Sequence, residues 1–117
     1  MSSQVITPEL VTLDVAPGSS PAAVTRHLAV LVAAAGRTAG AAGAGAGADA
    51  DAIAEAAIAR EESAPTGVPG GTAIPHFRSE VVAEPTLAFT RLSRPVDFGG
   101  PDGPSDLVFL IAMPGGA

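Results

Sequence analysis

A run of seven apolar residues near the end of the sequence, Leu107 to Met113, constrains the fold more than any other segment. The run is continuously apolar, and Pro114 with the two glycines that follow it breaks the pattern. An uninterrupted apolar strand is typical of a sheet position that is buried on both faces. Together with the helices predicted below, it indicates an α/β architecture in which helical layers cover a sheet.

Three other segments predict strands, because they are rich in β-branched residues, alternate between apolar and polar residues, or end at a proline. They are residues 11–15, 72–74 and 87–92. Glycines and prolines predict loops over residues 63–71 and 97–104. Strands separated by helices and loops in this way support the α/β assignment.

Two helices are predicted after the first strand. The first covers residues 21–35, because Ser20 supplies a hydroxyl cap, a proline occupies the first helical position and a glycine follows the end. Apolar residues at helical spacing give this helix one buried side. The second helix is predicted to begin at a cap provided by Asp49 or Asp51 and to run to about Glu62.

Residues 39–48, between the two predicted helices, consist of alanine and glycine alone. This low-complexity segment has no large side chain to bury, so it predicts a flexible connector or a helix start weakened by its glycines. The chain of 117 residues is expected to be a single small domain or part of one. With four Phe and neither Trp nor Tyr, its core should be aliphatic and modest in size.

Charge and composition exclude several functions. The net charge is −6 and all six basic residues are arginines, so the chain lacks the basic face of a nucleic-acid binder. Without cysteines and with two histidines, it has no disulfide, no thiolate nucleophile and no His-rich metal site.

The densest helical apolar run has eight residues, against roughly 20 for a membrane span, and no secretory signal is visible. We therefore expect a cytoplasmic domain that does not insert into a membrane.

The strongest chemical signal is His76, which follows a glycine-rich turn at Gly70 and Gly71 and a rigid proline. An accessible neutral imidazole can attack a phosphoryl group when a hydrogen bond holds its other nitrogen. Glycine N–H groups can cradle phosphate oxygens, and Arg60 can add a charge-assisted contact. The alternative is a histidine that ends a strand and merely binds a backbone carbonyl.

Other candidate residues carry weaker signals. His27, within the first predicted helix, is interpreted as a surface or boundary residue, although a supporting role near the site stays open. Glu61 and Glu62 are interpreted as solvated carboxylates. The loop over residues 67–71 has neither the Walker nor the dinucleotide-binding pattern, so no cofactor and no metal are predicted.

Several motifs, in order, resemble the fructose/mannitol-type (type 2) EIIA domain of the bacterial sugar phosphotransferase system. They are Arg60-Glu61-Glu62, Pro65-Thr66-Gly67, Gly71 to His76, Glu84 to Phe89, Val96 to Gly99 and Asp106 to Pro114. The resemblance covers about residues 5–117 and is closest to fructose-specific domains. It implies a mixed β-sheet with helices on both faces. A chance match in an inert α/β domain is the least favoured interpretation, because the motifs follow the family order.

The resemblance implies roles for individual residues. His76 would accept the phosphoryl group, Arg60 would be the active-site arginine, and Thr66 with the backbone of Gly70 and Gly71 would line the site. The phosphate would come from the phosphocarrier protein HPr and pass to a cysteine of a IIB domain during fructose uptake. A fused IIB domain and a membrane IIC domain would tether the chain to the inner face of the membrane. The alternative is a regulatory IIA module whose phosphorylation is a signal.

The sequence departs from the family pattern at its end. Family domains usually continue into further helices that cover the sheet, and many carry a second active-site histidine just after the segment that matches residues 114–117. We therefore expect a C-terminally truncated domain with an exposed sheet face or edge, a feature that favours association.

Overall fold

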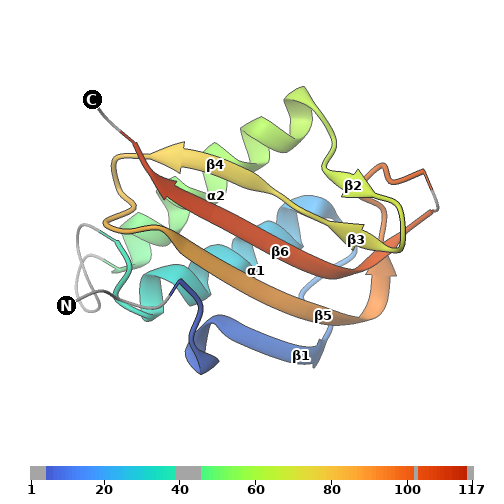
Figure 1. Cartoon of the computed structure of the whole chain (residues 1–117), viewed down its shortest axis with the longest axis horizontal. Coiled ribbons are helices and arrows are strands. Elements are labelled where there is room, and N and C mark those ends of the chain that lie inside the picture. Colours follow the sequence, from blue (N-terminus) through green and yellow to red (C-terminus); the bar gives the residue numbers. More distant parts are fainter. Residues whose placement is uncertain (1–4, 39–45, 102, 116–117) are drawn as a thin grey trace.

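A six-stranded mixed sheet forms the centre of the protein, with two helices behind it (Figure 1). The computed structural model describes residues 5–38, 46–101 and 103–115, without the side chains of residues 46–48. The elements in chain order are η1 (Pro8–Leu10), β1 (Val11–Val15), α1 (Pro21–Ala34), α2 (Ala46–Ser63), β2 (Gly67–Val68), β3 (Thr72–Ala73), β4 (His76–Ser79), β5 (Thr86–Val96) and β6 (Ser105–Pro114). The expected mixed α/β fold is confirmed.

The strand β6 organises the sheet, whose order is β1-β5-β6-β3-β2. Its antiparallel neighbour β5 pairs along nearly the whole strand, from Thr86 opposite Ala112 to Val96 opposite Ser105. On its other side β6 pairs in parallel with both β3 and β4, which follow one another along it. Figure 1 shows β3 and β4 in line beside β6, separated by a short break. That break contains the residues immediately before His76.

Local signals place the first helix where the sequence predicts it. The Ser20 side chain accepts a hydrogen bond from the Ala23 amide at 3.2 Å, and Pro21 occupies the first turn, as expected for a capped start. The helix ends before Gly36, whose φ of 75° is in the left-handed region that favours glycine. Prediction and structure differ by one residue at the end of α1.

The hydrophobic core lies between the sheet and the two helices. Leu28 of α1, Ile53 of α2 and Leu110 of β6 are fully buried there. Each such side chain stabilises the fold by about 1.5–3 kcal/mol through removal of apolar area from water. The two described helices pack on each other and on the same face of the sheet (Figure 1).

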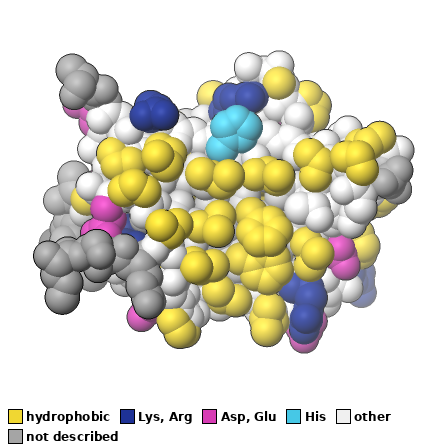
Figure 2. All heavy atoms as spheres, in the orientation of Figure 1, with side chains coloured by type: hydrophobic (Ala, Val, Ile, Leu, Met, Phe, Trp, Pro, Cys, Tyr) yellow, Lys and Arg dark blue, Asp and Glu magenta, His cyan; other side chains and the backbone are white. Residues whose placement is uncertain are grey.

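The prediction that Leu107–Met113 is buried on both faces is wrong. Along β6 the burial alternates: Val108, Leu110 and Ala112 are buried against the helices, while the side chains between them are half-buried. The opposite face carries no helix among the described residues, and Figure 2 shows it covered with hydrophobic side chains. There the rings of Phe89 and Phe109 contact each other, with centroids 4.6 Å apart.

The start of the second helix differs from prediction. The helix α2 begins at Ala46, before the predicted caps at Asp49 and Asp51. The last three residues of the Ala/Gly segment are therefore helical, and residues 39–45 lie outside the described part of the chain. Packing of Ile53 and Ala57 against α1 supplies the stability that the glycine-containing start lacks.

The strands around His76 also differ from prediction. The loop predicted over residues 63–71 contains the short strand β2, and β5 extends beyond residues 87–92 in both directions. The strand β4 was not predicted at all. These strands form by pairing with distant partners, such as His76 with Ile111, so their local sequence carries little signal.

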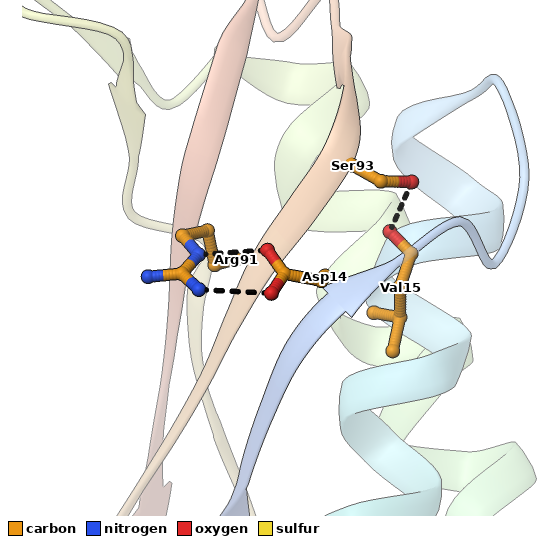
Figure 3. A network of polar contacts seen from close by, with 4 residues as sticks. All are labelled: Asp14, Val15, Arg91 and Ser93. Atoms are coloured by element: carbon orange, nitrogen blue, oxygen red, sulfur yellow. Dashed lines mark hydrogen bonds and ion pairs between the residues drawn. The ribbon is translucent and has the colours of Figure 1, made fainter.

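The outer strand β1 has an irregular end that is fastened to β5 (Figure 3). Asp14 has a φ of 60°, and the register shifts between Leu13 and Val15. The Arg91 guanidinium donates to both Asp14 carboxylate oxygens at 3.0 Å, and this contact lowers the pKa of Asp14. The irregularity and the exposed charges make this end of β1 a poor template for further strand pairing.

Candidate functional site

His76 lies where the chain passes from β3 to β4. The intervening Pro75 has no amide hydrogen to donate to the sheet, but its carbonyl accepts from the Ile111 amide at 2.9 Å. The Ile74 amide instead donates to the Thr66 carbonyl at 3.1 Å. The interruption presents His76 at the start of β4 with its side chain exposed.

Both ring nitrogens of His76 have a partner. Nδ1 lies 2.9 Å from the Ile74 carbonyl oxygen, and Nε2 lies 3.2 Å from an Arg60 guanidinium nitrogen. A carbonyl only accepts hydrogen bonds and a guanidinium only donates them. The neutral ring must therefore carry its proton on Nδ1, which donates to Ile74, and keep a lone pair on Nε2, which accepts from Arg60. This is the tautomer in which Nε2 is the nucleophilic nitrogen.

Arg60 reaches His76 from the last turns of α2. One terminal nitrogen donates to the Ala64 carbonyl at 3.3 Å, and the other contacts His76. Neither of these partners carries a negative charge, so they leave the positive charge of the guanidinium uncompensated. A fixed cation beside a nucleophilic nitrogen is well suited to an incoming anion. Figure 2 shows a histidine side chain at the surface of the open sheet face, next to basic side chains, in agreement with the exposure of His76.

Glu61 does not lie in solvent, so its interpretation as a solvated carboxylate is wrong. The residue is only 9% exposed, whereas Glu62 is exposed as expected. One carboxylate oxygen accepts from the Thr66 amide at 2.9 Å and the other from the Thr66 hydroxyl at 2.6 Å. The side chains of Arg60 and Glu61 therefore have different tasks, one at His76 and one at Thr66.

An open hollow of about 440 Å³ lies beside His76. The sequence-predicted residues Arg60, Thr66 and His76 all line it, together with Ile74, Ile111 and neighbouring residues of β2. A second open hollow, of about 360 Å³, lies against Arg60, His76 and Arg78. Arg60 and His76 line both hollows, so a group bound in either would meet the imidazole and the guanidinium together.

The glycines do not form the expected phosphate cradle. Gly70 and Gly71 line neither hollow and instead form the turn between β2 and β3, with φ values of 92° and 75°. Gly67 does line the larger hollow, but its amide donates to the Phe98 carbonyl at 2.9 Å. The expectation that Gly70 and Gly71 line the site is therefore corrected: they shape the hairpin.

His27 belongs to another region, where α1 packs against β1 and β5. Its Nε2 lies 2.9 Å from the Thr12 hydroxyl, which donates to the Thr90 hydroxyl at 2.9 Å. Burial lowers the pKa of His27. None of these partners contacts His76, so the structure gives His27 no role beside that residue.

The described residues contain no group of three or more His, Asp or Glu side chains arranged to hold a metal ion. None of their helices combines the length and the apolar character that a membrane crossing requires.

Sequence reasoning missed two elements of the site, the strand β4 and the contact between Glu61 and Thr66. For β4 the signal was too weak, because pairing with β6 over 30 residues away creates the strand. For Glu61 a signal was present, since a carboxylate near the end of a helix is followed within a short loop by a threonine.

The chain is similar to several known proteins. A family model described as "Phosphoenolpyruvate-dependent sugar phosphotransferase system, EIIA 2" matches residues 5–117. A fructose-specific EIIA component of Haloferax volcanii is 41% identical over 61 residues, which are 51% of this chain and 40% of that protein. A fructose-specific EIIABC component of Bacillus subtilis is 44% identical over 64 residues, 54% of this chain and 10% of that protein.

Regulatory proteins are also similar. A nitrogen regulatory protein of Bradyrhizobium diazoefficiens is 42% identical over 66 residues, 56% of this chain and 43% of that protein. The matched segment thus spans less than half the length of each of these three relatives.

Solved structures share the fold. The nitrogen regulatory protein IIA-Ntr from Neisseria meningitidis has a TM-score of 0.72 and 28% identity, over 94% of this chain and 69% of that one. The IIA mannitol domain from Escherichia coli has a TM-score of 0.71 over 92% of this chain and 71% of that one. Its identity is 21%, so this second likeness supports the fold alone.

Proposed function

Because this chain belongs to the EIIA 2 family of the phosphoenolpyruvate-dependent sugar phosphotransferase system, we propose that it carries a phosphoryl group on Nε2 of His76. The observation that carries the proposal is the hydrogen bonding of this exposed ring. Nδ1 donates to the Ile74 carbonyl, and Nε2 keeps its lone pair beside Arg60. A ring held in this tautomer is ready to attack phosphorus without prior loss of a proton.

The transfer exchanges one P–N bond for another. The Nε2 lone pair forms a bond to phosphorus while the bond between phosphorus and the donor histidine breaks, and its electron pair returns to the donor ring. Positive charge develops on the His76 ring and spreads to Nδ1–H. The Ile74 carbonyl, 2.9 Å from Nδ1, stabilises that charge through a hydrogen bond that strengthens as it develops.

Arg60 has a different task before and during transfer. In the free protein its guanidinium donates to Nε2 and orients the ring. When a phosphoryl group enters the hollow, the same N–H groups can turn to the phosphoryl oxygens and balance their charge. Thr66 lines the hollow with its hydroxyl proton committed to Glu61, so its oxygen is oriented by that bond.

We assign the donor and acceptor from the family and from the similar proteins. The donor is the phosphocarrier protein HPr, and the acceptor is a cysteine of a IIB domain that serves fructose uptake. Similarity to fructose-specific components, one of them an EIIABC protein, supports this choice. The reaction takes place in the cytoplasm, and a fused IIB and membrane IIC domain would hold the chain at the inner face of the membrane.

A regulatory role is the second candidate. Similarity to a nitrogen regulatory protein, and to the IIA-Ntr structure at 28% identity, favours it. In that role His76 is phosphorylated by the same chemistry, but the phosphorylation state is a signal and no sugar is moved.

The first experiment tests the acceptor residue. The protein is incubated with ³²P-labelled phospho-HPr, and the acid-labile label is counted on the protein. His76→Ala should abolish labelling, while His27→Ala, the matched control at the other histidine, should keep it. Equal labelling of His76→Ala and wild type would refute the proposal.

A second experiment separates transport from regulation. The labelled protein is mixed with a purified fructose-specific IIB domain. Transfer of the label to the IIB cysteine within seconds supports fructose uptake. A label that stays on His76 supports the regulatory role.

A further inference from the structure

The buried carboxylate of Glu61 follows Arg60 directly in the sequence and has no part in the transfer described above. A buried charge is costly unless hydrogen bonds compensate it. Within the described part of the chain, its two oxygens accept hydrogen bonds from one residue, Thr66, through its amide and its hydroxyl. A neutral side chain would fill the same space without that cost, so the contact with Thr66 calls for a function of its own.

Hydrogen bonds continue from Thr66 to the reactive ring. The Thr66 carbonyl accepts from the Ile74 amide at 3.1 Å. The carbonyl of the same Ile74 accepts from Nδ1–H of His76 at 2.9 Å. Glu61 thus holds the amide and the hydroxyl of Thr66, and the Thr66 carbonyl holds the Ile74 amide. The Ile74 carbonyl in turn selects Nδ1 as the ring nitrogen that bears the proton.

We propose that Glu61 is a positioning residue for phosphoryl transfer, which acts through Thr66 and Ile74 to hold His76 in the Nδ1–H tautomer. The inference rests on the proposed function, because the tautomer matters only if Nε2 is the attacking atom. Two adjacent residues near the end of α2 then control the two ring nitrogens. Arg60 controls Nε2 directly, and Glu61 controls Nδ1 through two intervening residues.

Loss of the Glu61 carboxylate should weaken the control over the His76 tautomer. Without it, the Thr66 amide and hydroxyl lose their acceptors, and the segment that positions Ile74 gains freedom. The His76 ring then populates the Nε2–H tautomer as well, in which Nε2 has no lone pair for attack. The defect should therefore appear in the ring before any phosphoryl donor is added.

The test compares substitutions at two neighbouring glutamates. Glu61→Met keeps the volume and removes the acceptors, Glu61→Gln keeps one carbonyl oxygen for the Thr66 amide, and Glu62→Met is the matched exposed control. Long-range ¹H–¹⁵N spectra of the imidazole at pH 8 report the tautomer, and transfer from phospho-HPr reports the rate. We expect a single Nδ1–H tautomer in wild type and Glu62→Met, and a mixture in Glu61→Met with transfer slowed at least tenfold. Glu61→Gln should restore part of both.

An unchanged tautomer and an unchanged rate in a folded Glu61→Met protein would overturn the inference. If Glu61→Met does not fold, Glu61→Gln and Thr66→Val take its place, and the absence of a tautomer shift in both would overturn it equally. The two failures are distinguishable. A wild-type protein that accepts no label from phospho-HPr refutes the proposed function. A labelled wild type with no dependence on Glu61 refutes this inference alone.

Discussion

The two histidines of this chain lie in different regions and have opposite surroundings. His76 is exposed at the start of β4, between a carbonyl and a guanidinium. His27 is half-buried in α1, and its ring meets the Thr12 hydroxyl. Desolvation lowers the pKa of His27 and favours its neutral form. The same side chain thus makes a half-buried hydrogen bond in one region and keeps an exposed nitrogen lone pair in the other, and its partners make the difference.

The tautomers illustrate this contrast. The Thr12 hydroxyl donates to Thr90, so it accepts from His27, whose Nε2 carries the proton. At His76 the proton is on Nδ1 instead. In the first case Nε2 donates its proton to a structural hydrogen bond, and in the second Nε2 keeps its lone pair and accepts from Arg60. We therefore expect substitutions beside His76 to change phosphoryl transfer and substitutions beside His27 to change stability. Equal effects of both sets on transfer and on stability would contradict this contrast.

Apart from loss of the acceptor His76 itself, the largest effect is expected at Arg60. Arg60→Ala removes the charge that faces both Nε2 and the incoming phosphoryl oxygens, so phosphoryl transfer should slow about 100-fold, equivalent to about 2.7 kcal/mol of transition-state stabilisation. The rate from phospho-HPr in rapid-quench experiments measures it. Arg94→Ala, an exposed arginine on β5, is the matched control and should transfer normally. Equal rates for the two variants would remove Arg60 from the mechanism.

A smaller effect, on stability alone, is expected around His27. Thr12→Val leaves the His27 ring and the fully buried Thr90 hydroxyl without their shared partner. The free energy of unfolding should fall by about 1–3 kcal/mol, as for other unsatisfied buried polar groups. Urea denaturation measures it, and phosphoryl transfer by the folded fraction should stay normal. Ser93→Ala, which removes an exposed hydroxyl near the same edge (Figure 3), should change stability by less than about 0.5 kcal/mol.

The smallest effect is a dependence of stability on pH. The pKa of His27 is lower in the folded protein than the 6.5 of the unfolded chain, so between these two values the unfolded state binds more protons. The contribution of neutral His27 is therefore complete above pH 6.5 and is lost as the pH falls towards the folded pKa. Denaturation at several values between pH 5 and pH 7.5 should show a flatter profile for His27→Gln than for wild type. Identical slopes would mean that His27 does not titrate differently in the two states.

Local sequence signals predicted the parts of the fold that depend on near neighbours. The Ser20 cap, with a proline beside it, correctly located α1, and the β-branched run over residues 11–15 correctly located β1. The apolar run in β6 correctly predicted a central strand, but not that one of its faces would lie open. Burial of that second face depends on what else packs there, and a strand's own residues do not contain this information.

The sequence predicted which residues gather at the site, but not the hydrogen bonds that join Glu61 to Thr66. The resemblance brought together His76 and Arg60, and the structure places them in contact across sixteen positions of sequence. Their catalytic roles stay predictions. The expected contribution of Gly70 and Gly71 was wrong, because a glycine pattern does not reveal whether it serves a ligand or a hairpin turn. Glu61 was misread as solvated, because charged residues are rarely buried and its partner follows only after the helix has ended.

The most direct test of the account is the position of the phosphoryl group on the modified protein. After reaction with phospho-HPr, heteronuclear NMR at alkaline pH can identify the nitrogen that is coupled to ³¹P. We expect a single phosphorylated atom, Nε2 of His76, with the signals of the His27 ring unchanged. Phosphorus on Nδ1 of His76, on His27 or on a carboxylate would contradict it.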